Sequence, residues 1–334
     1  MKARIAAAAA LLLLLTACTA DRAPEGGPPE TTDAPAPAQP TENVPFNAAA
    51  YMEDALAHIE ADALFIRDID WAAVRADALD RTSGAAAPEE THGVLQEVLT
   101  QAGGRHSSLR QPLDNAAYSY IATPEVEAAA PGIAVVTVPG FRSPRPEHVG
   151  EYAAAGTDGI LAGAKDTSCG WIVDLRRNGG GNMGPMLGAL SPLLPDGTLM
   201  QFIDRDGQAQ EVLLDGARVS LDAQELAPAA AAKDTGKPVA VLQSDGTASS
   251  AEAVLLSLSA VPDVRTFGAP TAGLATSNVV RTLSDGTALR ITQSHMATAA
   301  GETVSGGPLE PDVATEDALG AATDWLRGMC GAGR

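Results

Sequence analysis

The spacing of apolar residues predicts helices in the first part of the folded chain and a strand–helix alternation after it. Between residues 48 and 102, three segments carry apolar residues three or four positions apart, as Met52, Leu56 and Ile59 do in the first. After residue 133, short apolar runs rich in β-branched residues alternate with helical patterns. The sequence therefore predicts an α/β protein with a mixed β-sheet flanked by helices, preceded by a helical lobe.

Turn residues and caps divide these patterns into individual elements. The second helix of the lobe is expected to begin at Asp68 or Asp70, because Asp is a preferred helix cap. Residues 221–237 are rich in alanine and are expected to be helical or loop. Strands are expected at 133–138, 171–175, 239–242 and 264–267, paired strands at 200–214, a hairpin at 278–293, and helices at 147–165, 252–260 and 316–326.

The first 46 residues are expected to lie outside the folded part of the chain. Lys2 and Arg4 precede an apolar run at 5–15 that is too short to span a bilayer, which is typical of an export signal. The run ends in Leu-Thr-Ala-Cys18, which looks like a lipobox, so Cys18 is expected to be lipidated. The predicted organisation is a lipoprotein signal at 1–18, a flexible Pro-rich tether at 19–46, the helical lobe at 47–110 and the α/β core at 111–334.

Charge and cysteine content narrow the possible partners. The formal net charge of −20 argues against nucleic acid and anionic lipid as partners, so membrane contact is expected through the lipid anchor only. Apart from Cys18 the chain contains only Cys169 and Cys330. In an oxidising compartment these two can form a disulfide, and they can equally remain as buried free thiols.

Two segments place polar groups where a strand turns into a helix. In PVAVLQSDGTASSAE (238–252), Ser249 and Ser250 lie just before the expected helix, where unpaired amides can bind negative charge. Ser249 can also be a simple helix cap. In CGWIVDLRRNGGGNMGPML (169–187), a Gly-rich turn exposes backbone N–H groups that suit an anion or an oxyanion. This turn lacks the G-x-G-x-x-G and Gly-Lys-Ser/Thr patterns of nucleotide-binding loops.

Together the two segments resemble the S41 peptidase family, which includes the tail-specific or C-terminal processing proteases and their tricorn-like relatives. The resemblance extends from about Ala48 to the end of the chain and implies a ClpP/crotonase-like core. It also implies Ser249 as the nucleophile, with the amides of Ser250 and of Gly180 or Gly181 binding the oxyanion. Four ordered motifs carry it: DLRRNGGG at 174–181, TASSAE at 247–252, G-x-P-T-x-G at 268–273 and G-x-x-x-E-P-D at 306–312.

The resemblance favours a histidine over a lysine as the general base. The processing proteases pair the serine with a lysine at the position where this chain has Leu274. The segment around His106 is similar to the place from which the tricorn-like branch takes its histidine, and Glu302 lies near the position of that branch's glutamate. Without the resemblance, His295 is a rival for the base. Glu310 and Asp312 lie close enough to Glu302 in sequence to be confused with it.

These observations lead to the hypothesis of a lipid-anchored serine endopeptidase on the extracytoplasmic face, which hydrolyses polypeptides by a Ser249–His106–Glu302 mechanism. About 25 residues separate His106 from the next expected strand, which leaves no room for a PDZ domain to grip the substrate. No metal or cofactor is expected, because no cluster of Cys, His and carboxylates has ligand spacing. The alternative is a catalytically inactive protein of the same fold that binds peptides or apolar ligands. An esterase using the same serine is a third possibility.

Overall fold

The computed structural model describes residues 45–110, 121–304 and 307–332. The signal at 1–18 with Cys18, and the tether up to residue 44, lie outside these described residues, so they stay predictions. No helix within the described ranges has both the length and the apolar character needed to cross a membrane.

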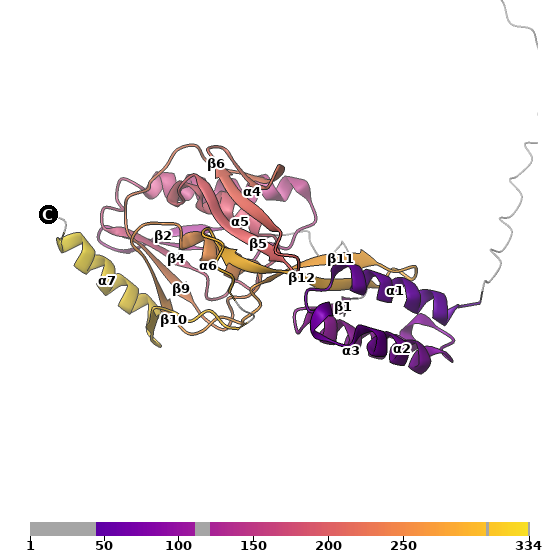
Figure 1. The fold of residues 1–334 in the computed structure, drawn as a ribbon. Helices are drawn as coiled ribbons and strands as arrows, with labels where there is room; N and C mark the ends of the chain where they lie inside the picture. The colour runs from indigo at the N-terminus through magenta and orange to yellow at the C-terminus, as the bar shows by residue number, and fades with distance from the viewer. Residues whose placement is uncertain (1–44, 111–120, 305–306, 333–334) are drawn as a thin grey trace, which may run out of the picture. The chain divides into compact units, whose positions relative to one another are not determined.

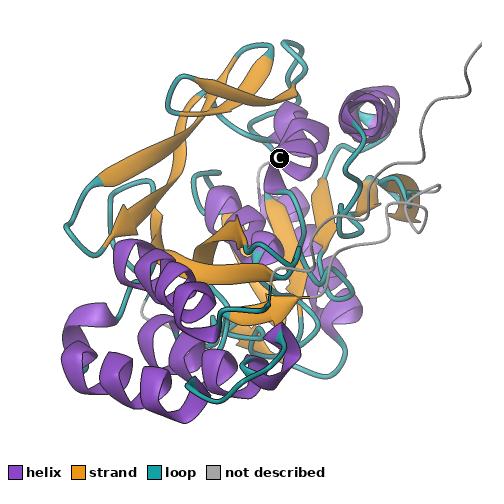
Figure 2. Cartoon of the chain, turned by 90° about the vertical axis from the view of Figure 1, so that its right-hand side faces the viewer, coloured by secondary structure: helices purple, strands orange, loops and turns teal. Residues whose placement is uncertain are grey.

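The predicted helical lobe is present and consists of three α-helices, which lie together in Figures 1 and 2. α1 (Ala48–Asp62) is capped by Asn47, whose side chain accepts from the Ala50 amide at 3.1 Å. α2 (Trp71–Thr82) is capped by Asp70, so Asp70 rather than Asp68 begins it. α3 (His92–Gly103) ends at a glycine pair. Short 3-10 turns connect them at Ile66–Asp68 and Pro88–Glu90.

A six-stranded mixed sheet forms the centre of the rest of the chain, in the order β13-β10-β9-β4-β3-β2. Its pairs are parallel except for β2 with β3. Helices cover both faces. On β9, Val239 and Val241 face the main core under α4, α5 and α6, while Ala240 and Leu242 face α7. The elements are β2 (Glu125–Ala130), β3 (Ile133–Thr137), β4 (Gly170–Asp174), β9 (Val239–Gln243), β10 (Val264–Gly268), β13 (Val313–Ala314), α4 (Pro146–Gly163), α5 (Met183–Leu190), α6 (Ser250–Leu258) and α7 (Ala318–Ala332).

A second, antiparallel sheet has seven strands, in the order β1-β12-β5-β6-β7-β8 with β11 also paired to β12. The expectation of helix or loop at 221–237 was wrong in its first part, because β8 is a strand there. The alanine content suggested helix, but Leu226 and Ala227 pack against α5, and tertiary packing overrides local propensity. The strands are β1 (Ser108–Arg110), β5 (Gly197–Asp204), β6 (Ala209–Asp215), β7 (Arg218–Leu221), β8 (Gln224–Pro228), β11 (Thr276–Thr282) and β12 (Ala288–Thr298), with a 3-10 turn at Ser191–Leu193 before β5.

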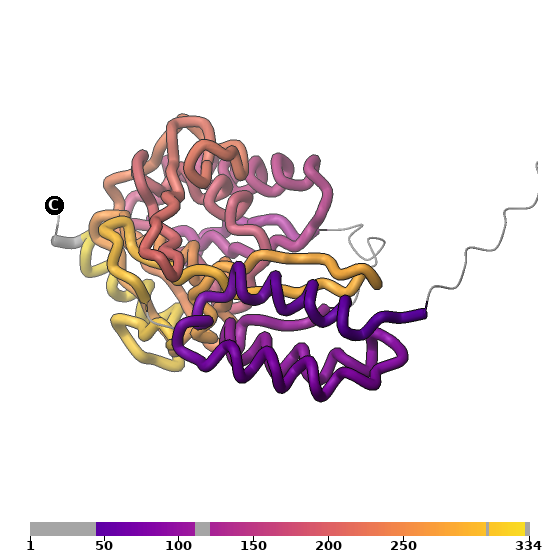
Figure 3. The backbone as a smooth tube through the Cα atoms, turned by 45° about the vertical axis from the view of Figure 1, so that its right-hand side comes forward, coloured from indigo at the N-terminus to yellow at the C-terminus, as the bar shows by residue number. Residues whose placement is uncertain are grey.

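The long strand β12 belongs to both halves of the molecule. Its first half pairs with β1 and β11 beside the lobe, where Leu289 and Ile291 complete the core of the three helices. Its second half pairs with β5, and Met296 packs into the main core. Figures 1 and 3 show the β11–β12 hairpin, in orange, running alongside the indigo helices. One strand thus fixes the lobe against the α/β core.

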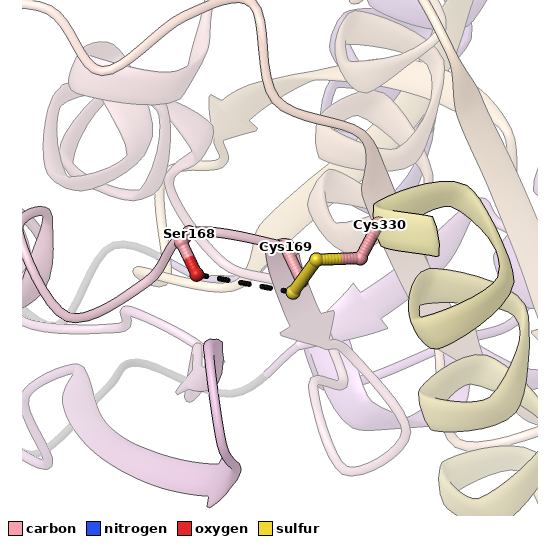
Figure 4. The surroundings of a disulfide bond; sticks show 3 residues. All are labelled: Ser168, Cys169 and Cys330. Atoms are coloured by element: carbon pink, nitrogen blue, oxygen red, sulfur yellow. Dashed lines mark hydrogen bonds between the residues drawn. A yellow bond between two sulfur atoms is a disulfide. The ribbon is translucent and has the colours of Figure 1, made fainter. Parts of the chain in front are cut away.

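Cys169 and Cys330 form a disulfide, so the paired alternative is the right one (Figure 4). Their Cα atoms lie 4.8 Å apart and their positions are separated by 161 residues. The bond ties the end of α7 to the residue just before β4. In the chain-entropy model, a cross-link over a loop of this length lowers the free energy of the folded state relative to the unfolded one by about 5 kcal/mol.

Candidate active site

Ser249 lies at a sharp turn between strand β9 and helix α6. Its backbone has φ +56° and ψ −117°, a conformation that non-glycine residues rarely adopt. Such strain costs about 1–3 kcal/mol and persists only where the surroundings enforce it, which is frequent at functional sites. The turn projects a half-buried serine hydroxyl from the end of a buried strand. This geometry favours the nucleophile interpretation of Ser249 over the simple cap.

The buried carboxylate of Glu252 enforces this turn. Its Oε2 accepts from the backbone amides of Ser249 at 2.7 Å and Leu274 at 2.8 Å. Its Oε1 accepts from the Thr271 hydroxyl at 2.6 Å and the Gly273 amide at 2.9 Å. Glu252 has no solvent exposure, so these four donors replace its hydration. One side chain therefore holds the Ser249 turn to the loop at 271–274.

The Gly-rich loop packs directly against the serine turn. Gly180 has φ +87°, and a Cβ at this position would lie 3.0 Å from both the Ser249 Cβ and the Ser250 amide nitrogen. A side chain would therefore push the two segments apart, and only glycine allows this approach. The contact is fixed by the Ala248 amide, which donates to the Asn178 carbonyl at 3.1 Å. The Ser250 hydroxyl also donates to the Gly181 carbonyl.

Two of the three expected oxyanion amides point to no protein acceptor. Within the described residues, the backbone N–H groups of Ser250 and Gly181 donate to no protein atom. Gly180 differs, because its amide donates to the Asn178 side-chain oxygen at 3.0 Å. Asn178 is itself buried and donates to the Val138 carbonyl. The donor pair suited to an oxyanion is therefore Ser250 and Gly181, with Gly180 shaping the loop.

His106 comes from the lobe, in the turn between α3 and β1. Gly104 has φ +70° and ends the helix, as a glycine just beyond a helix commonly does. Arg105 donates to the carbonyls of Ala272 and Gly273, the latter at 2.7 Å. Because the Gly273 amide is bound by Glu252, the turn of His106 and the turn of Ser249 are fixed to the same loop. Two turns that are 143 positions apart in sequence, those of His106 and Ser249, are therefore both bonded to the loop at 271–274.

The hydrogen bonds around His106 indicate a neutral imidazole. Its Nδ1 lies 2.8 Å from the Thr276 hydroxyl, and the Asn278 amide nitrogen lies 3.2 Å from its Nε2 and 3.3 Å from its Nδ1. The Asn278 oxygen accepts from the Thr292 hydroxyl at 2.9 Å, so the amide must turn its NH₂ group toward the ring. The NH₂ group can only donate, so at least one ring nitrogen is unprotonated, and the tautomer that suits a base has Nε2 accepting and Nδ1–H donating to the Thr276 hydroxyl. This tautomer leaves Nε2 as the basic nitrogen.

Burial and positive charge oppose protonation of this ring. Burial, followed by the charges of Arg290, Arg105 and Arg110, lowers the pKa of His106 from 6.5 to about 4. An imidazolium would lose solvation in a site 5% exposed and would face three guanidinium groups. His106 is therefore neutral at physiological pH and able to accept a proton.

The structure does not bring Glu302 to His106. Glu302 is exposed at the turn after β12, where its amide donates to the Thr298 hydroxyl at 3.2 Å. Within the described residues no carboxylate oxygen lies within 4 Å of a ring nitrogen of His106, and the histidines paired with carboxylates are His58 and His92. Asp312 instead accepts from Thr266, and Glu310 is exposed. The group beside Nδ1 in this structure is the neutral hydroxyl of Thr276.

Three further observations bear on which residues are catalytic. Among the described residues there is no hydrogen bond between Ser249 and His106. The rival His295 lies on β12 opposite Thr276, with its ring edge-on to Phe65 at 5.7 Å and its buried Nδ1 without a partner. Burial lowers the pKa of His295 as well. No group of three His, Cys, Asp or Glu side chains in the described ranges is placed to hold a metal ion.

Sequence reasoning missed Thr276, Asn278 and Arg105. Asn278 begins the expected hairpin at 278–293 and Thr276 lies two positions before it, on the same strand in the structure, but neither type is a usual partner of a catalytic histidine. Arg105 stands next to His106, and nothing in the sequence relates it to a loop 167 positions away. The sequence did indicate a role for Glu252, since it is the last residue of the TASSAE motif.

Replacing Glu252 with glutamine is expected to destabilise the protein by about 3 kcal/mol or more. Each carboxylate oxygen of Glu252 accepts from two donors. In either orientation, the NH₂ group of the glutamine side chain would therefore face two N–H or O–H donors and leave them unpaired. Chemical denaturation of E252Q and wild type measures the loss. E302Q, the same change at an exposed carboxylate, is the matched control and should unfold with the wild type. Equal midpoints for E252Q and E302Q would contradict the assigned role.

Comparison with known proteins supports the resemblance found in the motifs. The sequence matches the profile of the family described as Peptidase family S41 over residues 132–315. The nisin-resistance protein of Lactococcus lactis subsp. lactis is 29% identical over 285 residues, which is 85% of this chain and 88% of that protein. The carboxy-terminal processing protease CtpA of Bacillus subtilis (strain 168) is 30% identical over 160 residues, which is 48% of this chain and 31% of that protease.

Solved structures show the same fold. A lipoprotein from Streptococcus agalactiae is similar with a TM-score of 0.73 and 25% identity, over 86% of this chain and 99% of that one. The photosystem II D1 C-terminal processing protease has a TM-score of 0.58 at 16% identity, over 85% of this chain and 97% of that one, and is alike in fold. Since the family profile spans more than half of the sequence and its motifs converge on one site, the chain belongs to peptidase family S41.

Proposed function

We propose that this protein is a serine peptidase in which Ser249 is the nucleophile and His106 the general base. The observation that carries the proposal is the strained Ser249 backbone at φ +56°, enforced by a buried carboxylate and set against the Gly-rich loop. Strain of this kind is maintained by the fold at a cost, and a simple helix cap does not require it. Membership of a peptidase family supports a polypeptide as substrate.

The proposed reaction follows the serine–histidine mechanism. The Ser249 Oγ attacks the peptide carbonyl carbon while its proton passes to His106 Nε2, whose lone pair the Asn278 amide must first release. The amides of Ser250 and Gly181 stabilise the oxyanion. His106 then gives the proton to the leaving amine, and water hydrolyses the acyl-enzyme. Thr276 takes the orienting place expected for Glu302, since it holds Nδ1. Catalytic hydrogen bonds are often long in free enzymes, so the Ser249–His106 contact is assigned to the substrate complex.

The location and substrate range belong to the same proposal. The lipobox at Cys18 supports a lipid anchor on the extracytoplasmic face, and the similar structure from Streptococcus agalactiae is of a lipoprotein. The disulfide fits an oxidising exterior. The curated relative of matching length is a nisin-resistance protein, so nisin is one peptide to test as a substrate.

A fluorophosphonate probe tests the proposal without knowledge of the substrate, because it forms a covalent bond with an activated serine. Intact mass should show one adduct on the wild type and none on S249A. The matched control is S259A, at the far end of α6, which should label normally. Absence of an adduct on the wild type, or an adduct that remains on S249A, would overturn the proposal.

The lack of a Ser249–His106 hydrogen bond among the described residues favours a second candidate, a non-catalytic protein that binds peptides or apolar ligands. The same experiment separates the two. An unlabelled protein that retains peptides from a mixture supports the binding protein, and a labelled one supports the peptidase.

A further inference from the structure

The strands β1, β12 and β11 form a small platform whose two faces differ. One face carries Leu109, Leu289 and Ile291, which pack against the helices of the lobe. Side chains alternate along a strand, so the neighbouring positions lie on the opposite face. The registers Ser108↔Arg290, Val280↔Arg290 and Asn278↔Thr292 place these residues together. The face away from the lobe carries Ser108, Arg110, Asn278, Val280, Arg290 and Thr292.

Two adjacent polar atoms on this face lack a partner. The Ser108 Oγ and the Arg290 Nε are buried, and neither makes a hydrogen bond with any described residue. Ser108 and Arg290 are cross-strand neighbours. Ser108 also lies two residues after His106 in the chain. An arginine Nε–H can only donate, so the group that completes this pair must be an acceptor. Buried donors without acceptors are costly, which points to a ligand at this position.

The surrounding charge defines that ligand further. Arg105, Arg110, Arg142 and Arg290 form no ion pair with any carboxylate in the described ranges, although the chain has a net charge of −20. Burial, then the charges of Arg110 and Arg142, lowers the pKa of Arg290, so these guanidinium groups lie within electrostatic reach of one another. Arg142 is fixed beside the Gly-rich loop, donating to the Gly179 carbonyl at 2.8 Å. As far as the described residues show, a positive field without counter-charge thus borders the candidate site.

We propose that Arg290 and Ser108, assisted by Arg110, bind a carboxylate of the polypeptide substrate close to the bond that is cleaved. This inference rests on the proposed peptidase function and specifies its substrate. A guanidinium fork matches the planar geometry of a carboxylate, and a serine hydroxyl beside it supplies a further donor. The carboxylate is either the terminal one of a peptide or the side chain of an acidic residue, since both present the same planar acceptor.

A bound carboxylate also acts on the base. It offsets the charges of Arg290 and Arg110, which contribute to the low pKa of His106. The pKa of His106 is therefore higher in the complex than in the free protein, and the imidazole becomes a stronger proton acceptor when such a substrate is bound. Substrates without the carboxylate lose both the contact and this activation.

Three synthetic mixtures of acetylated hexapeptides separate the possibilities. The first has a free C-terminal carboxylate and no Asp or Glu, the second a C-terminal amide and no Asp or Glu, and the third a C-terminal amide and one Glu. The wild type should cleave the first or the third at least about 10-fold faster than the second, the usual scale for a hydrogen bond to a charged group. Whichever is preferred identifies the source of the carboxylate.

Variants assign the effect to Arg290. R290Q should reduce the ratio of kcat/KM for the preferred mixture to kcat/KM for the second mixture to about one, and R290K should retain part of the preference. The control R265Q removes an exposed arginine on β10, with the same change in charge, and should behave as the wild type. Retention of the three mixtures on immobilised S249A protein measures the same preference through binding instead of cleavage.

The outcomes are separable. Equal cleavage and retention of the three mixtures, or an R290Q loss that is the same for all three, overturns the carboxylate site. A protein that neither cleaves nor retains any mixture also overturns it. Failure of fluorophosphonate labelling overturns the peptidase function itself. A labelled enzyme without carboxylate preference overturns only this inference.

Discussion

In S249A, the hydrolysis rate is expected to fall by about 10⁴-fold or more, because removal of the nucleophile of a serine–histidine pair leaves only binding and oxyanion stabilisation. The fold should be retained, since the Ser249 amide keeps its bond to Glu252, and loss of the serine side chain from the N-cap of α6 should cost about 1 kcal/mol. Turnover of a peptide identified from the hexapeptide mixtures, measured for S249A and for the control S259A, provides the comparison.

A glycine at the same position separates the role in catalysis from the strain in the backbone. S249G should be as inactive as S249A, yet more stable than S249A by roughly 1 kcal/mol, because glycine accepts φ +56° without steric cost. Thermal or denaturant unfolding measures this difference. An active S249A protein, or S249A and S249G of equal stability, would show that the turn is neither catalytic nor strained in this way.

Loss of the base is the second large effect. H106A should reduce kcat/KM by about 10³-fold or more, as removal of one member of a catalytic unit does. H295A, the matched control from the neighbouring strand, should lose far less, because its ring packs against Phe65 and makes no hydrogen bond to Thr276. An inactive H295A together with an active H106A would transfer the role of base to His295.

The pH profile tests the electrostatics of the same residue. The groups around His106 are Arg105 in its own turn, Arg110 on β1, Arg290 on β12, and the neutral Thr276 and Asn278 on β11. Since the pKa of His106 is lowered to about 4, kcat/KM should fall only as the pH drops through about 4. N278D sets a carboxylate against the ring and should raise this pKa, moving the acidic limb upward. A wild-type limb near 6.5 would contradict the buried, arginine-flanked site.

Sequence reasoning predicted the parts of the fold that local patterns encode. The helices of the lobe, the strands 171–175 and 239–242 and the hairpin at 278–293 are present because apolar periodicity and turn residues determine them. β1, β2, β7 and β8 escaped notice, because they are short, exposed or alanine-rich and exist through pairing with distant strands.

Some residues of the candidate site could likewise be predicted from local sequence, and others could not. The Gly-rich loop, Ser249 and His106 stand in motifs and could be named from sequence. The partners of His106 could not, because Thr276 and Asn278 reach it through the register of β11 on β12 and the bulge between Ser277 and Asn278. The expectation of Glu302 came from family position alone. The exposure of that side chain and its hairpin turn depend on where β12 ends.

Because β12 contributes to both the lobe and the α/β core, it affects the order in which the parts of the protein can fold during synthesis. The lobe is synthesised early, but its core lacks Leu283, Leu289 and Ile291 until the hairpin is made some 200 residues later. Contacts of such sequence separation form late in folding, because the loop between them must close first. His106 therefore acquires Thr276 and Asn278 only after most of the chain exists. A nascent chain without this hairpin lacks the partners of His106, so under the proposed mechanism it is inactive until the residues of β11 and β12 have been added.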